Sequence, residues 1–236
     1  MSIIASYPPH RLLISRGFRL AVLLLGLMAG ALAGYAALNA SALQQQLVDR
    51  FGPARVPLLN DWLQTVSEVK KAKESAKLEQ INDFINHRIS FESDQTVWNQ
   101  SDYWATPLEI IGQGAGDCED FSIIKLISLR MAGVASNKLR LVYVKATLTT
   151  PAGKFQQAHM ILAYYPTPTA EPLLLDNLNP RILPASKRSD LQPVFSFNNE
   201  GIFAGVAGTE KAAAGGIGRL SRWEDAWQRI LAEDYE

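Results

Sequence analysis

Residues 114–121, with the sequence GAGDCEDF, decide the fold. A glycine-rich turn leads here into an apolar stretch with helical spacing, and the only cysteine of the chain, Cys118, stands at the junction. Backbone N–H groups and the positive end of the dipole at a helix N-terminus stabilise a thiolate and can hold an oxyanion. We therefore predict a helix that begins near Cys118, with this cysteine as a candidate nucleophile.

The candidate base is His159. Of the three histidines, His10 lies in the N-terminal segment and His87 falls off the apolar stripe of an amphipathic helix, whereas His159 opens an apolar strand-like run. A second such run ends in Asp176. If the two runs pair as a hairpin, His159 lies opposite or diagonal to Asp176, within reach of a hydrogen bond. Cys118, His159 and Asp176 are then a candidate nucleophile, base and orienting carboxylate. In the open alternative, Asp176 only ends a strand and His159 only satisfies a polar contact in the core.

The patterns on both sides of the cysteine predict an α+β fold. Apolar residues recur at helical spacing over residues 62–69 and 78–89, which predicts N-terminal core helices. The helix after Cys118 is apolar on nearly all sides and should end at Gly133, so we expect it to be buried and central. Runs rich in Leu, Val and Tyr then predict an antiparallel meander of strands over residues 139–148, 156–165 and 172–178, with a further strand over 194–197.

Two local signals predict helix starts elsewhere. Thr106 followed by Pro107 is typical of an N-cap and first helical residue, and we expect this short helix to stop at Gly112. Ser221 with Glu224 has the spacing of a capping box for a last helix.

The composition bounds the function classes. The chain has 236 residues with 23 basic and 23 acidic side chains, so no broad basic surface indicates a nucleic-acid partner. Arginines precede an uncharged stretch over residues 20–38 that is rich in Leu and Ala and is followed by small residues. This pattern predicts a signal peptide or an N-terminal membrane anchor within residues 1–42, followed by one domain over residues 43–236. We expect a periplasmic domain, cleaved or tethered; a buried core helix is the alternative for the apolar stretch.

Several stretches resemble the bacterial transglutaminase-like cysteine peptidases, in particular the LapG type, a periplasmic adhesin-releasing protease. They are DYWATP (102–107), GAGDCEDF (114–121), LRLVYVKA (139–146), QAHM (157–160), LDNL (175–178) and VFSFN (194–198). The resemblance covers roughly residues 55 to 235. It implies a papain- and transglutaminase-like fold and a cysteine endopeptidase whose triad is Cys118, His159 and Asp176.

The resemblance also implies a biological role. Proteases of this type cut the N-terminal region of a large cell-surface adhesin near a pair of alanines, which releases the adhesin and promotes biofilm dispersal. The implied inhibitory partner is an inner-membrane cyclic-di-GMP receptor.

The residues beside the cysteine raise an electrostatic question. Asp117, Glu119 and Asp120 place negative charge around the thiol, and like charge disfavours the thiolate. Clustered carboxylates suit Ca²⁺, whose charge would reverse the local sign. The resemblance implies calcium dependence through Asp117 and Glu119, with Asp120 less certain. Alternatively, Asp117 only caps the helix while Asp120 complements its dipole.

Other functions and features remain open at this point. The same triad would serve a transglutaminase-type acyltransferase, and a non-catalytic exported binding module could keep the fold. We expect the backbone N–H of Cys118 to donate to the oxyanion, with Trp104 or Gln113 as the second donor. An alanine-rich stretch over residues 209–215 suggests self-cleavage or, more simply, a flexible connector.

Overall fold

The computed structural model describes residues 40–205 and 220–235. The chain divides into two compact units, residues 1–41 and residues 42–236. The apolar stretch over residues 20–38 and the alanine-rich stretch over residues 209–215 lie outside the described residues. Among the residues that are described, no helix combines the length and apolar character needed to cross a membrane.

The described helices lie on both sides of the cysteine in sequence. A helix over residues 40–51 comes first, and all but its first two residues belong to the larger unit. The α-helices that follow are α2 (Val56–Val69), α3 (Glu74–Arg88), α4 (Asp94–Val97), α5 (Pro107–Gln113), α6 (Cys118–Met131) and α7 (Ser221–Glu233). Three short 3₁₀ turns are η1 (Pro53–Arg55), η2 (Ser136–Lys138) and η3 (Ala185–Lys187).

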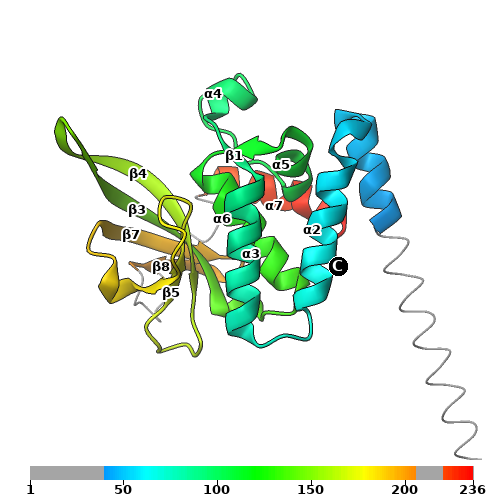
Figure 1. Ribbon diagram of the computed structural model, residues 1–236. Coiled ribbons are helices and arrows are strands. Elements are labelled where there is room, and N and C mark those ends of the chain that lie inside the picture. The colour runs from blue at the N-terminus through cyan, green and yellow to red at the C-terminus, as the bar shows by residue number, and fades with distance from the viewer. Residues whose placement is uncertain (1–39, 206–219, 236) are drawn as a thin grey trace, which may run out of the picture. The chain divides into compact units, whose positions relative to one another are not determined.

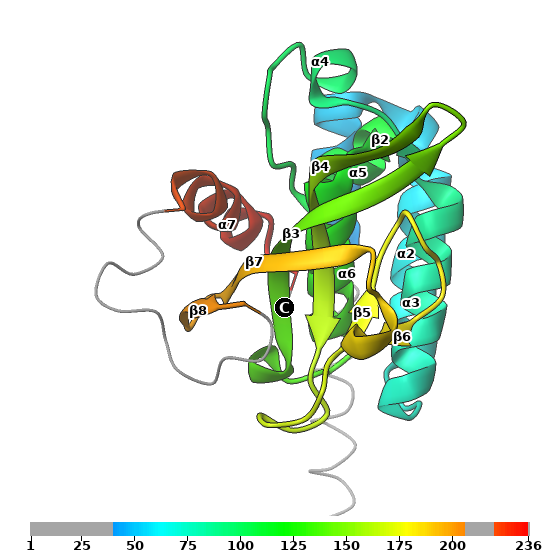
Figure 2. The same cartoon turned by 90° about the vertical axis from the view of Figure 1, so that its left-hand side faces the viewer.

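The strands form one large sheet and one small pair. The large sheet is antiparallel with the order β6-β5-β4-β3-β7-β8. Its strands are β3 (Leu139–Thr150), β4 (Gly153–Tyr164), β5 (Leu173–Leu175), β6 (Leu183–Pro184), β7 (Leu191–Asn198) and β8 (Gly201–Ala204). The small pair, β1 (Ser90–Phe91) with β2 (Ala115–Gly116), is parallel. The predicted meander is confirmed, and Figure 2 shows its long β3–β4 hairpin reaching beyond the other strands.

Helix α6 lies between the sheet and the helices α2 and α3 (Figure 1). Met160 and Leu162 of β4 share the main core with the helices, whereas Ile161 belongs to a smaller apolar cluster that includes Val142 and Val144. This division follows from the alternation of side chains along a strand. The predicted α+β fold, with a cysteine-bearing helix packed on an antiparallel sheet, is confirmed.

The predicted central helix is buried from residue 120 to residue 129. Its core apolar residues are Phe121, Ile123, Ile124, Leu126, Ile127 and Leu129. Trp62 of α2 donates from Nε1 to Ser128 Oγ at 2.8 Å, which satisfies a polar pair inside this packing. The helix ends where Gly133 adopts a φ of 85°, as predicted.

The two predicted helix starts have different outcomes. Thr106 caps α5, since its side chain accepts from Glu109 N and Glu109 Oε2 accepts from Thr106 N at 2.8 Å. The helix ends at Gln113, one residue past Gly112, because Gly114 is the left-handed C-cap, with a φ of 70°. Gly112 lies within the helix, where a Cβ would be 2.3 Å from the ring of Phe51.

The predicted box at the last helix is wrong. Leu220 is the N-cap of α7 and no side chain caps the helix. Glu224 N donates to Leu220 O, so the first turn starts one residue earlier than the motif predicted and Ser221 is already helical.

Candidate active site

The loop before α6 fixes the position of Cys118. Ala115 and Gly116 pair in parallel with β1, and the chain then turns into α6 with Asp117 as its N-cap and Cys118 as the first helical residue. The cap is a capping box in which Asp120 accepts from Asp117 N. Gly116 makes room for it, because a Cβ at this position would lie 2.6 Å from Asp120 Oδ2. The predicted helix start is confirmed.

The structure brings His159 and Asp176 together. Leu162 of β4 pairs with Leu175 of β5, so Asp176, the residue after β5, is diagonal to His159 across the two strands. His159 Nε2 lies 2.8 Å from Asp176 Oδ1, and each residue is 1% exposed. This is the contact that the hairpin register predicted.

Asp176 has further partners that hold it ionised. Leu178 N donates to Oδ1 at 3.0 Å, and Arg188 Nη2 donates to Oδ2 at 2.7 Å. Burial pushes the pKa of Asp176 upward, but the hydrogen bonds and charges of His159 and Arg188 outweigh it and bring the pKa to about 2. An ionised carboxylate only accepts, so Nε2 of His159 carries a proton that it donates to Asp176, and in the neutral ring Nδ1 is then the acceptor.

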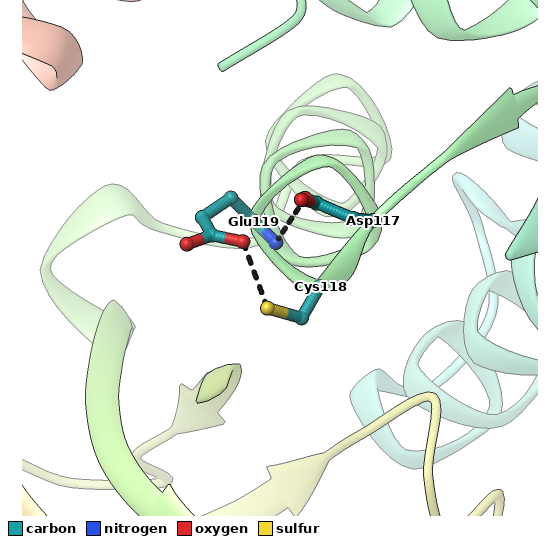
Figure 3. A group of neighbouring side chains, drawn as sticks. All are labelled: Asp117, Cys118 and Glu119. Atoms are coloured by element: carbon teal, nitrogen blue, oxygen red, sulfur yellow. Dashed lines mark hydrogen bonds between the residues drawn. The ribbon is translucent and has the colours of Figure 1, made fainter. Parts of the chain in front are cut away.

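The thiol of Cys118 does not contact that ring nitrogen by a hydrogen bond. Sγ donates to Glu119 Oε2 at 2.8 Å (Figure 3). It also lies against the backbone N–H of Met160, which places the cysteine beside the residue that follows His159 on β4. Within the described residues, no hydrogen bond joins Sγ to the imidazole. The structure therefore places Cys118 beside β4, the strand that carries His159, but pairs its thiol with Glu119.

The electrostatics of this arrangement favour the protonated thiol. Burial comes first, and the charge of Glu119, its hydrogen bond to Sγ and the charge of Asp117 add to it, so the pKa of Cys118 lies well above its ordinary value. A hydrogen bond from Met160 N acts in the opposite direction. A positive charge near Sγ would favour the thiolate.

Two overlapping groups of side chains that could hold a metal ion lie at the N-terminus of α6. The side chains of Asp117, Cys118 and Glu119 offer ligand atoms within 4.8 Å of one another, and so do those of Asp94, Asp117 and Asp120. Burial and the charges of Glu119 and Asp120 raise the pKa of Asp117 to about 9. Such crowding of buried acids is costly unless a proton or a cation offsets it.

Comparison with known proteins identifies the family. A profile of the bacterial transglutaminase-like cysteine proteinases, BTLCP, matches residues 61–190. The chain belongs to this family. Its structure resembles LapG of Legionella pneumophila at 36% sequence identity with a TM-score of 0.65, over 81% of this chain and 97% of that one. A search of curated proteins found no match.

The family assignment confirms the predicted resemblance and its fold, and it makes the chain a member of a cysteine peptidase family. Two further LapG structures from Legionella pneumophila match over 81% of this chain. One is calcium-bound, with 37% identity, a TM-score of 0.66 and 98% of that chain covered. The other was treated with EGTA, with 36% identity, a TM-score of 0.67 and 97% covered.

The donor set of this BTLCP chain fits calcium. Asp120 uses both carboxylate oxygens on backbone N–H groups, those of Ala105 at 2.8 Å and Asp117 at 3.3 Å, so its role is structural. Asp94 accepts from Tyr103 N through Oδ2, while its Oδ1 is buried without a hydrogen-bond partner among the described residues. An orphaned carboxylate oxygen beside other carboxylates suits a hard cation. The capping alternative and calcium binding are thus compatible, because the cap leaves acceptor oxygens unused.

Sequence reasoning missed Asp94 and was incomplete for the oxyanion site. Asp94 is the first residue of the short helix α4, and nothing in its spacing connects it to Cys118.

Trp104 donates from its indole Nε1 to Asp102 Oδ1 at 3.1 Å, so this candidate oxyanion donor already has an acceptor. Gln113 is the last residue of α5. The second oxyanion donor stays a prediction.

Proposed function

We propose that this chain is a calcium-dependent periplasmic cysteine endopeptidase that cleaves the N-terminal region of a large cell-surface adhesin near a pair of alanines. The observation that carries the peptidase activity is the buried pair of His159 and Asp176 beside Cys118 at the start of α6. Membership of the BTLCP family and similarity to LapG support it. We assign the catalytic roles of nucleophile, base and orienting acid to Cys118, His159 and Asp176.

The cellular role extends this proposal. Release of the adhesin promotes biofilm dispersal, and an inner-membrane cyclic-di-GMP receptor is the inhibitory partner. The arginine-flanked apolar stretch over residues 20–38 supports export to the periplasm. The resemblance of residues 102–107 and 114–121 to the LapG type supports the choice of substrate.

The reaction uses the free nitrogen of the imidazole. Nδ1 of His159 takes the proton of the Cys118 thiol, and Sγ attacks the substrate carbonyl carbon. When the C–N bond breaks, the imidazolium returns the proton to the departing amine. The acyl group of the substrate stays on Sγ as a thioester. Water then attacks the thioester with His159 again as the base, which releases the carboxylic acid and restores the thiol.

Two features of the chain assist these steps. Asp176 stays ionised at neutral pH, so it stabilises the imidazolium through the Nε2 hydrogen bond. The cap of α6 uses the N–H groups of Glu119 and Asp120, which leaves the N–H of Cys118 to donate to the oxyanion.

Asp117 and Glu119 are the residues that would hold calcium, with Asp94 as a further carboxylate at the same place. A bound ion there would supply positive charge that offsets the carboxylates around the thiol. Glu119 has two competing roles in this proposal, since the carboxylate that would bind the cation also accepts the hydrogen bond of the Cys118 thiol.

The test is cleavage of an adhesin fragment that contains a dialanine site, incubated with the full chain in Ca²⁺ or in EGTA. We expect two products in Ca²⁺, none in EGTA, and recovery when Ca²⁺ but not Mg²⁺ is added back. Unchanged cleavage in EGTA would contradict the calcium dependence. Intact fragment under all conditions would contradict the proposed substrate.

The masses of the products define the reaction type. Hydrolysis adds one water to the sum of the products, whereas acyl transfer to a lysine releases ammonia and joins two chains. We expect the hydrolytic masses. Cross-linked products that lack the elements of ammonia would identify a transglutaminase instead.

A further inference from the structure

Arg188 is a buried arginine that contacts the candidate acid of the active site. It follows η3 and is 3% exposed. Its Nη2 lies 2.7 Å from Asp176 Oδ2, and the same guanidinium reaches Asp190 through Nε at 2.9 Å and Nη2 at 2.7 Å. Asp190 is the more exposed of the two carboxylates, so the buried end of this bridge is the contact to Asp176.

The two oxygens of Asp176 have different neighbours. Oδ1 accepts from His159 Nε2 and from Leu178 N, whereas the partner of Oδ2 is Arg188. Asp176 follows a strand of only three residues, so regular sheet pairing does not fix its side chain. The arginine therefore holds the oxygen of the carboxylate that the imidazole does not contact, and a planar guanidinium does this with a fixed geometry.

We propose that Arg188 is a positioning residue of the peptidase site, which holds Asp176 so that the proton of His159 stays on Nε2 and Nδ1 faces the thiol. This inference rests on the proposed function, because it specifies which ring nitrogen of His159 acts as the base in that reaction. Nothing in the local sequence pattern marks Arg188, which lies 12 positions after Asp176.

Other charged groups act on the same carboxylate. Lys125 of α6 places its positive charge near Asp176 and near Asp83 of α3. Arg188 differs from Lys125 because it makes a direct hydrogen bond to Asp176. A purely structural role for Arg188 would be to attach the segment after η3 to the sheet, and the test must separate this role from positioning.

The first measurement is the tautomer of His159 in the full-length protein, read from the ¹⁵N chemical shifts of its ring nitrogens at a pH where the ring is neutral. We expect Nε2–H in the wild type and a mixture of tautomers in Arg188→Gln. The control is Arg140→Gln, the same change at another buried arginine, which packs over the rings of Phe203 and Tyr165. The control should keep the Nε2–H form. A folded Arg188→Gln protein with the wild-type tautomer would overturn the inference.

The second measurement is kinetic and uses the adhesin fragment. Arg188→Gln should lower kcat roughly 10- to 100-fold, the size of a lost hydrogen bond to a charged group, while KM changes less than about 3-fold. In an Asp176→Asn background, Arg188→Gln should lower kcat by less than about 3-fold, because the carboxylate that Arg188 contacts is already lost. Equal effects of Arg188→Gln in both backgrounds would show that it does not act through Asp176.

A third variant covers failure to fold. Arg188→Lys keeps the charge but cannot reach both carboxylates with a rigid fork, so we expect a smaller loss of kcat and a partial loss of the Nε2–H tautomer. Wild-type kcat and tautomer in this variant would contradict the inference. Because the tautomer is measured without substrate, a failed peptidase assay and a failed positioning role give different results.

Discussion

Lys125 provides a stability prediction that follows from burial alone. It lies in the middle of α6, is 1% exposed, and has its ammonium 5.8 Å from the centroid of the Phe121 ring. Burial lowers its pKa from 10.5 to about 7, although the charges of Asp176 and Asp83 act in the opposite direction. We predict that Lys125→Met, which keeps a flexible chain of similar length, stabilises the protein at pH 6.

The magnitude follows from the pKa difference. A change from 10.5 to about 7 corresponds to about 5 kcal/mol at about 1.4 kcal/mol per pKa unit, and this is an upper bound. We expect Lys125→Met to raise the free energy of unfolding by about 2–4 kcal/mol at pH 6, because local relaxation reduces the cost of the buried ammonium.

The sign of the pH dependence is fixed by proton binding. Between about pH 7 and pH 10.5 the unfolded chain binds a proton at Lys125 that the folded chain has released. The stability of the wild type, relative to the variant, therefore rises with pH across this window. Below about pH 7 the cost of the buried lysine is fully present, and above pH 10.5 it disappears.

The assay is urea unfolding followed by tryptophan fluorescence at pH 6 and pH 9. We expect the gap between Lys125→Met and wild type to shrink at pH 9. Lys145→Met, at an exposed lysine of β3, is the control and should change stability by less than about 0.5 kcal/mol. A Lys125→Met protein that is less stable than wild type at pH 6, or a gap that does not depend on pH, would refute the reasoning.

Further predictions concern the active site and a helix cap. Cys118→Ala should leave the free energy of unfolding within about 1 kcal/mol of wild type and abolish cleavage; residual cleavage would remove the nucleophile assignment. Asp94→Asn should weaken Ca²⁺ binding about 10-fold or more by calorimetry, because it removes a charge from the donor set, and an unchanged affinity would exclude this residue as a ligand. Ionised Asp176 should contribute about 2 kcal/mol to the free energy of unfolding above pH 4, and this contribution is lost as the pH falls to about 2. In Asp176→Asn the free energy of unfolding should therefore depend less on pH between pH 4 and pH 2, and an unchanged pH dependence would contradict the low pKa. Thr106→Ala should lower the free energy of unfolding, measured in urea, by about 1–2 kcal/mol. A smaller decrease than for Thr→Ala at an exposed threonine would contradict the capping role.

Local and periodic signals explain what the sequence could predict. The start of α6 depends on contacts between neighbours, since Asp117 and Asp120 cap it within one turn. The contact between His159 and Asp176 follows from the register of two paired strands joined by the loop over residues 165–172. Both features are encoded within a few residues, or within one hairpin, so a pattern in the sequence can carry them.

The missed features depend on tertiary contacts. Arg188 follows the 3₁₀ turn η3, and Asp94 begins the four-residue helix α4. Segments this short have no periodicity that predicts their position at the site. Lys125 lies in a helix that is apolar on nearly all sides, so its burial is visible in the pattern but its neighbours are not. The orientation of the Cys118 thiol toward Glu119 is a choice of side-chain rotamer, which a residue pattern does not determine.

The most direct test of the central claim is the rate at which iodoacetamide alkylates Cys118 in Ca²⁺. Because the chain has one cysteine, a single mass increase of the intact protein reports this residue alone. The account predicts that the wild type reacts at least about 10-fold faster than His159→Gln, since the imidazole takes the thiol proton. Equal rates in the two proteins would contradict it.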